Sequence, residues 1–446
     1  MSEAANISKA SDTADLAEPR VSTFELFFDL VFVFALTGVT GSLAHDTTWE
    51  HFGQALLIFA VLWWAWGSYA WLTNAMATDE VVSRLVVLLG MGAMLVVGLA
   101  VPDAFGSSGV AFALGYLVVI VLQSVLFSVA GGAFRGTLAL VPTKGGAALL
   151  LVAAGFADGA FRTALWVSAV ALCYAGPFLV GVAEFTVRPS HFVERHGLIV
   201  IVALGESVVA IGAGGDHDVG WSLASAGLIA IVLVSGLWWS YFHAESGHAE
   251  RALSEADGVD QSRLARDVYS YLHIPLVLGV VLTAVGIDQT FAARDEPLTT
   301  VAAVALGSGV AMYYAALAAI RVRRGARPRI TQLALVVIAG LVVPAATKLP
   351  SIVSLATLAV AILIGTCAEH LSAVRELRTC EGLRGHASLS GEPPHKREDP
   401  RAVQGSSGTC RLSQRAADEA RTRDPQLGKL ANNRMLKPCT SPMRPE

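Results

Sequence analysis

Long apolar runs separated by short polar segments occupy the chain from about residue 22 to residue 371. A helix needs about 20 residues to cross the ~30 Å hydrocarbon core of a bilayer. Twelve runs reach roughly this length, near residues 25–43, 52–73, 82–101, 109–130, 138–157, 163–183, 196–213, 221–243, 269–290, 299–320, 331–347 and 351–371. The pattern predicts an all-α fold, a polytopic helical membrane protein with about 12 transmembrane helices.

The fifth and eleventh runs are the weakest members of this set. Pro142, Lys144 and Gly145 interrupt the fifth, and Pro344 interrupts the eleventh. Because every span reverses the direction of the chain, loss of one of them would invert the topology that follows it. The number of spans therefore depends on these two segments.

Composition supports a membrane protein as well. Of the 446 residues, 54% are hydrophobic and 15% are charged, and the mean hydropathy is +0.57. An ordinary soluble domain carries about 25% charged residues. The composition therefore excludes a soluble globular protein and makes the lipid bilayer the first expected partner.

Basic residues predict the orientation. With the N-terminus inside, the cytosolic flanks before residue 375 hold fifteen basic residues: Lys9, Arg20, Arg84, Arg135, Lys144, Arg188, Arg195, Arg251, Arg263, Arg266, Arg321, Arg323, Arg324, Arg327 and Arg329. The outer loops hold three, Arg162, Arg294 and Lys348. The positive-inside rule then places both termini in the cytosol.

The two ends of the chain differ in character from its centre. Residues 1–21 are polar and contain no apolar stretch typical of a removable signal peptide, so we expect a cytosolic N-terminus. From residue 375 to 446 the chain is rich in Gly, Pro, Ser and basic residues, which predicts a disordered basic cytosolic tail. An irrelevant extension of the chain is the alternative. The five cysteines lie in spans or in this tail, so we expect neither disulfides nor a cysteine metal site.

The chain also carries signs of an internal duplication. The stretch Phe32 to Leu36 parallels Val200 to Leu204, and the pair Trp63-Trp64 parallels Trp238-Trp239. Residues 22–183 and 184–374 would then form two six-helix halves. Six spans per half is an even number, so the halves would share one orientation, as in several transporter folds. Chance similarity between apolar helices is the alternative.

Two acids lie near the start of the first span. Glu25 and Asp29 are four residues apart, so a helix places both on one face, with Asp29 about 6 Å deeper in the membrane. Two close carboxylates in a low-dielectric setting repel each other, which predicts a shared proton. The alternative is that Glu25 is a solvated first-turn acid favoured by the helix dipole.

Glu206 is the strongest candidate for a proton, ion or substrate site. It follows Glu194 by twelve residues, about 18 Å along a helix, which places it near the middle of the membrane. An ionisable group there costs about 2.5–3.5 kcal/mol and normally serves a function. Gly205 and Ser207 beside it predict the close approach of another helix. A structural, protonated glutamate is the alternative.

A charge cluster is predicted at the inner mouth of the seventh span, formed by His191, Glu194, Arg195 and His196. The spacing of its histidines and glutamate differs by one residue from the inverted zinc-protease motif, so we expect no metal. Interfacial charges that set helix depth or gate access to Glu206 fit better. His273, two residues before Pro275, is a further candidate, with a packing role as its alternative.

Other features favour no additional chemistry. Six tryptophans near span ends are predicted to be interfacial anchors: Trp63, Trp64, Trp66, Trp71, Trp238 and Trp239. Neither a phosphate-binding G-x-x-x-x-G-K loop nor a G-x-S-x-G elbow occurs. We therefore expect no catalytic residues, no cofactor and no nucleic-acid partner.

Three motifs resemble one known family. The stretch Ser22 to Leu36 is similar to the signature of the bacterial low temperature requirement A family. Glu194 to Leu198, continuing into Ala203 to Ser207, resembles its second signature, and Tyr269 to Pro275 a third. The resemblance runs from about residue 20 to 372. It implies a multi-pass protein of the bacterial cytoplasmic membrane, linked by the family's name to growth in the cold.

Three hypotheses of function remain. A secondary transporter or proton-coupled permease for an unknown small solute or ion accounts best for twelve spans, an apparent repeat and buried acids. A membrane sensor or scaffold that supports the envelope in the cold is the second, and a membrane-embedded enzyme the third. The sequence leaves the solute, the coupling ion and the oligomeric state open.

Overall fold

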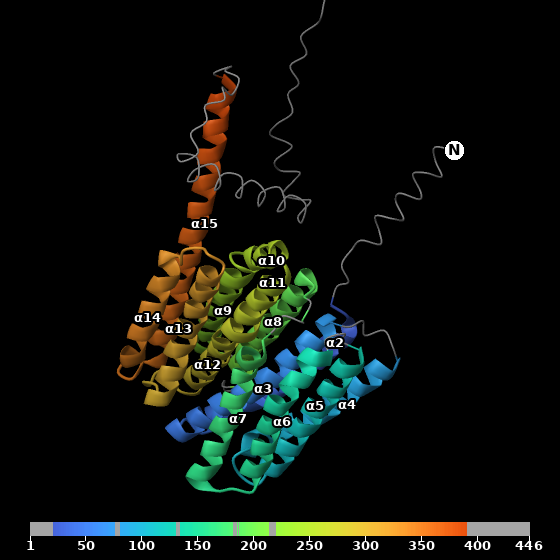
Figure 1. Cartoon of the computed structure of the whole chain (residues 1–446). Helices are drawn as coiled ribbons and strands as arrows, with labels where there is room; N and C mark the ends of the chain where they lie inside the picture. The colour runs from blue at the N-terminus through green and yellow to red at the C-terminus, as the bar shows by residue number, and fades with distance from the viewer. Residues whose placement is uncertain are drawn as a thin grey trace, which may run out of the picture. The chain divides into compact units, whose positions relative to one another are not determined.

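The computed structural model describes residues 21–75, 81–130, 134–181, 185, 187–213 and 220–389. All regular structure in these residues is helical (Figure 1). The chain divides into two units, Met1–Thr366 and Cys367–Glu446. The first unit contains the predicted membrane region up to the last helix, and it is the part that concerns the site.

Each predicted span is a helix. The twelve long helices of the described chain are α2 (Thr23–His45), α3 (Trp49–Ala75), α4 (Val81–Ala100), α5 (Gly109–Ala130), α6 (Phe134–Gly155), α7 (Gly159–Val180), α8 (Pro189–Ala213), α9 (Trp221–Phe242), α12 (His273–Ala292), α13 (Thr300–Arg323), α14 (Ile330–Ala346) and α15 (Ser351–Leu389). The prediction of an all-α multi-pass membrane protein is confirmed.

Ten of these helices are long and apolar enough to cross a membrane, counted over the described residues. The apolar parts of the other two are shorter, Ala139–Gly155 in α6 and Ile330–Ala346 in α14. These are the fifth and eleventh spans, which the sequence marks as weakest. Their prolines, Pro142 and Pro344, both lie inside the helices.

The helices α2 and α8 run parallel and side by side. Near their starts, Arg195 of α8 contacts Glu25 of α2. Further along both helices, Glu206 of α8 contacts Thr37 of α2. Two helices can run parallel across a membrane only if an odd number of crossings separates them. The five intervening helices, α3 to α7, satisfy this condition only if α6 also crosses.

Several neighbouring helix pairs of one predicted half have a counterpart in the other. In the first half α2 packs on α3 and on α4, α4 packs on α5, and α5 packs on α6. The corresponding pairs of the second half also pack: α8 on α9 and α12, α12 on α13, and α13 on α14. This correspondence agrees with a duplication, which stays a prediction.

The tightest packing joins α12 to α13. A Cβ atom built on Gly279 would lie 2.6 Å from the carbonyl oxygen of Gly309, and one built on Gly309 would lie 2.7 Å from that of Gly279. No side chain fits at either position, so the two backbones meet directly. Before α12 the chain forms a π-helical turn, η2 (Arg266–Leu272), and α10 (Ser246–Glu255) and α11 (Gly258–Ala265) precede it.

Both ends of the chain extend beyond what the structure describes. Helix α2 begins with a capping box, in which the Ser22 hydroxyl accepts from the Glu25 amide and the Glu25 carboxylate accepts from the Ser22 amide. Helix α15 continues to Leu389, past residue 375 where a disordered tail is predicted. The remainder of that tail, residues 390–446, and the N-terminal residues 1–20 lie outside the described residues.

Candidate functional site

Glu25 and Asp29 are both buried within the helix bundle. Their exposed fractions are 3% and 1%. Glu25 therefore combines the first-turn role with burial, since its carboxylate completes the capping box of α2 yet is shielded from solvent. The alternative considered from the sequence, that Glu25 is exposed to solvent, is therefore wrong. Asp29 lies one turn further along the same face.

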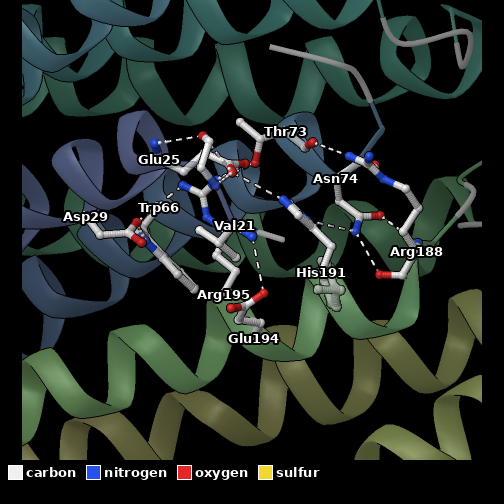
Figure 2. A network of polar contacts seen from close by, with 12 residues as sticks. Val21, Glu25, Asp29, Trp66, Thr73, Asn74, Arg188, His191, Glu194 and Arg195 are labelled. Carbon is white, nitrogen blue, oxygen red and sulfur yellow. Dashed lines mark hydrogen bonds and ion pairs between the residues drawn. The ribbon is translucent and has the colours of Figure 1, made fainter. Parts of the chain in front are cut away.

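Arg195 of α8 joins the two carboxylates (Figure 2). Its Nη1 lies 3.1 Å from Oε1 of Glu25 and its Nη2 lies 3.3 Å from Oδ1 of Asp29. The same Oδ1 accepts a 2.8 Å hydrogen bond from the indole of Trp66. One guanidinium therefore faces two carboxylates, and the shared proton predicted from the sequence stays a prediction. The sequence analysis counted Arg195 as a flanking charge, whereas the side chain is 1% exposed.

The network extends from Glu25 to the end of α3. Nε2 of His191 lies 3.2 Å from Oε2 of Glu25, and Arg195 also donates to the hydroxyl of Thr73. The side chain of Asn74 makes two hydrogen bonds with the backbone of Arg188. Its Nδ2 donates to the Arg188 carbonyl oxygen (3.1 Å), and its Oδ1 accepts from the Arg188 amide (3.0 Å). These contacts fasten the start of α8 to α2 and α3.

Two members of the predicted charge cluster lie apart from this network. Glu194 is exposed and accepts a 3.2 Å hydrogen bond from the backbone amide of Val21. His196 is buried, its Nδ1 is 2.8 Å from the Phe192 oxygen, and its ring lies 5.0 Å from that of Trp66. Of the four predicted residues, His191 and Arg195 thus contact the buried acids directly.

His273 belongs to an aromatic cluster on the other side of His196. The two imidazole rings are 5.5 Å apart. Nε2 of His273 lies 2.9 Å from the hydroxyl of Tyr241, and its Nδ1 lies 2.8 Å from the oxygen of Val268 in η2. Both ring nitrogens therefore have partners. This arrangement matches the packing role that the sequence analysis held open for His273.

Glu206 lies on α8 about 18 Å beyond Glu194, and is 6% exposed. Its Oε2 is 2.7 Å from Oγ1 of Thr37 on α2. Oγ1 of Thr37 also lies 3.2 Å from the carbonyl oxygen of Val33 one turn earlier. Within the described residues, Glu206 has no basic partner, in contrast to Glu25 and Asp29.

The predicted close approach at Gly205 is wrong. Among the described residues, nothing lies within 4 Å of a Cβ atom built on Gly205. Gly205 instead lines a groove with Leu204, Val208 and Trp238. Ser207, by contrast, is fully buried. The small residues beside Glu206 thus leave space on one side and pack tightly on the other.

Sequence reasoning missed one buried acid, Glu245, which precedes α10. It is 1% exposed and forms ion pairs with Arg321 (2.7 Å), in the last turn of α13, and with Arg324 (2.5 Å), which caps that helix. The run of arginines from 321 to 329 was the available signal, because buried acids usually accompany clustered cations. This cluster ties the start of α10 to the end of α13.

Several tryptophans of α3 were placed wrongly. Trp63, Trp64 and Trp66 are buried, with exposed fractions of 1%, 8% and 0%, so the interfacial prediction fails for them. Trp238 and Trp239 remain exposed at 42% and 40%. The aromatic side chains of α3 therefore form part of the core, and the donor groups of Trp63, Trp66 and Trp71 bind other helices.

The fold and these contacts define a helical, multi-pass membrane protein with ionisable groups buried between parallel helices. A family model described as bacterial low temperature requirement A protein (LtrA) matches residues 20–367. The chain belongs to this family, which confirms the resemblance inferred from its motifs. A relative from Rhizobium meliloti (strain 1021), uncharacterized protein RA0937, is 29% identical over 294 residues, covering 62% of this chain and 70% of the relative.

Proposed function

We propose that the protein is a secondary transporter, coupled to protons or a small cation, in which Glu206 is the coupling site. Glu206 and Thr37 join α2 to α8, the first helices of the two predicted halves. In transporters built from such halves, substrate and ion sites lie near the middle of the membrane where the halves meet. The depth of Glu206 agrees with that position.

The arrangement at Thr37 carries the proposal. Its hydroxyl oxygen lies within hydrogen-bond distance of both the Glu206 carboxylate and the Val33 carbonyl. When Glu206 is ionised, the Thr37 hydroxyl donates to it. When Glu206 is protonated, the acid donates to Thr37, which then donates to Val33. Hydrogen bonding is satisfied in both states, so the surroundings permit a proton to enter and leave.

The inner network supports a division of roles among the acids. Glu25 and Asp29 face the fixed positive charge of Arg195. Both acids thus have a direct cationic partner, whereas Glu206 has none within the described residues. We therefore assign Glu25 and Asp29 to holding α2 on α8, and Glu206 to the titrating step.

The exchange Glu206→Gln tests this proposal. Glutamine retains the shape and hydrogen bonding of a protonated glutamate but cannot release a proton. We expect normal accumulation in the membrane, loss of growth in the cold in a complementation assay, and loss of coupled proton movement in proteoliposomes. Glu255→Gln is the control, because Glu255 is exposed and belongs to no candidate site. It should behave as wild type.

A chemical test can be made without knowing the solute. Dicyclohexylcarbodiimide modifies protonated carboxyl groups in apolar surroundings, so peptide mass spectrometry should find Glu206 modified and Glu25 unmodified. Thr37→Val, which removes the hydroxyl, should impair complementation more than Thr37→Ser. Full complementation by Glu206→Gln at normal protein levels would contradict the proposal, because the charge would then be dispensable.

A further inference from the structure

A cavity of about 60 Å³ lies among α3, α6 and η2, separate from Glu206. Its lining includes Trp63, Trp64, Trp71, Lys144, Arg266 and Ser270. Among the described residues that line it, two are cations and none is acidic. The cavity thus combines aromatic walls with a net positive charge.

Lys144 is the unusual member of this lining. It lies inside α6 and is 8% exposed, although the sequence analysis counted it as a flanking charge. Its Nζ donates to Oε1 of Gln123 at 3.3 Å, and no carboxylate pairs with it in the described part of the chain. A charged side chain in a span normally has a partner or a use.

Arg266 adds to the positive charge of the cavity. It pairs with Asp267 at 2.7 Å, but Asp267 also pairs with Arg323 at 2.8 Å. The three residues together therefore keep one net positive charge. The Arg266 guanidinium also lies 4.4 Å from the centre of the Phe178 ring.

A free donor also belongs to the cavity lining. The indole N–H of Trp64 is buried and has no hydrogen-bond partner within the described residues. The neighbouring indoles do have partners, since Trp63 donates to the carbonyl of Ser270 and Trp71 to its hydroxyl, both at 2.9 Å. Buried donors are almost always satisfied, so an unpaired one beside a cavity points to a ligand.

We propose that this cavity binds the anionic head group of an organic anion, with Lys144 as its charge partner and the Trp64 N–H as a second donor. The volume exceeds the ~10–15 Å³ that one water needs and is far below the ~300–1,000 Å³ of sites that enclose a whole drug-sized ligand. A carboxylate or phosphate group fits, with the apolar body of the ligand against the tryptophans. The ligand is either a free solute or an anionic lipid.

If the ligand is a free solute, an anion should bind to the full chain in nanodiscs of uncharged phosphatidylcholine. Tryptophan fluorescence is followed while hexanoate, or inorganic phosphate, is added. The wild-type signal should saturate. Lys144→Met should weaken the affinity at least about tenfold, Trp64→Phe should weaken it less, and Lys144→Arg should retain it. Lys348→Met, at an exposed lysine of the outer loops, is the matched control and should bind as wild type.

A lipid source gives a different result. Phosphatidylglycerol nanodiscs would then raise the melting temperature of the wild type relative to phosphatidylcholine nanodiscs, and Lys144→Met would abolish that difference. Either pattern supports the anion site. Equal affinity and equal lipid response in the wild type, Lys144→Met and Trp64→Phe would overturn it. Because Glu206 is intact in these variants, failure here leaves the transporter proposal standing.

Discussion

Arg195 determines the charge balance where α2 and α8 begin. It contacts two carboxylates, so with both acids ionised the group of Glu25, Asp29 and Arg195 carries one net negative charge. Nε2 of His191 lies 3.2 Å from Oε2 of Glu25 on the other side of that carboxylate from Arg195 Nη1, which is 3.1 Å from Oε1. Burial makes each of these charges dependent on the others, because a carboxylate removed from water needs a partner.

We therefore expect Arg195→Met to destabilise the protein by about 3–5 kcal/mol, the usual cost of leaving a buried charge unpaired. Thermal unfolding in detergent measures the effect. The triple exchange Glu25→Gln, Asp29→Asn, Arg195→Met should recover much of the lost stability, since it leaves no charge behind.

Arg263→Met is the control for this experiment. Arg263 pairs with Asp260 at 3.4 Å, but its side chain is 57% exposed. Exposed pairs contribute about 0–1 kcal/mol, so this variant should melt close to wild type. An Arg195→Met protein that also melts like wild type would show that the network contributes nothing to stability.

Local spacing explains why part of this site was predictable. Glu25 and Asp29 are four residues apart, so helix periodicity alone places them on one face. The partner Arg195 lies 170 residues away, and no periodicity within a helix encodes a contact between helices. The same limit misplaced Lys144, because a count of flanking charges cannot separate a cation at the interface from one buried against Gln123.

At the scale of elements, α12 and α13 depend on two glycines that face each other. A methyl group at Gly309 would lie 2.7 Å from the backbone nitrogen of Thr283 as well as from the Gly279 oxygen. Backbone atoms cannot move aside as a flexible side chain can. The helices would have to separate, with loss of contacts along their length.

Gly309→Ala should therefore lower stability by about 1–3 kcal/mol, in the range of overpacked cores. Gly340→Ala on α14 is the matched control, because a Cβ atom there meets nothing within 4 Å among the described residues. It should be neutral or slightly stabilising, since alanine favours helix more than glycine does. Melting curves of the two variants decide the matter. Equal melting temperatures would show that α12 and α13 can separate at no cost.

The elements were the most predictable part of the structure. Each span carries its own apolar run of about 20 residues, so its existence needs no knowledge of its neighbours. The π-helical turn η2 was not predictable. Pro275 indicates that backbone groups before it lose their hydrogen-bond partner, but it does not indicate which helical turn the chain adopts there. The burial of Trp63 and Trp66 depends likewise on which helices surround α3.

At the scale of the whole molecule, twelve crossings would place the C-terminus on the same side of the membrane as the N-terminus, which can be tested. We expect a reporter that works only in the cytosol to be active when it is fused at Glu446. A reporter that works only outside should be silent there, and the opposite pattern would contradict a cytosolic C-terminus.

Two loops provide an independent measure of topology. Asp158, between α6 and α7, and Asp260, in α11, have side chains that are 97% and 83% exposed. In a cysteine-free background, a membrane-impermeant thiol reagent added to intact cells should label Asp158→Cys and not Asp260→Cys. With a cytosolic N-terminus, labelling of Asp260→Cys and not of Asp158→Cys would show that α6 does not cross the membrane, contrary to the positive-inside prediction.

The π-helical turn η2 distributes three consecutive residues among three helices. Tyr269 packs against Phe192 of α8, Ser270 accepts the indole N–H of Trp71 of α3, and Tyr271 donates to the carbonyl of Tyr174 of α7. A turn with this hydrogen-bond pattern holds more residues than an α-helical one. The number of residues in η2 therefore matters as much as their identity, because it sets which helix each side chain reaches. Deleting a single residue here would shift all three side chains at once, so one change would break the contacts of η2 with α3, α7 and α8 together.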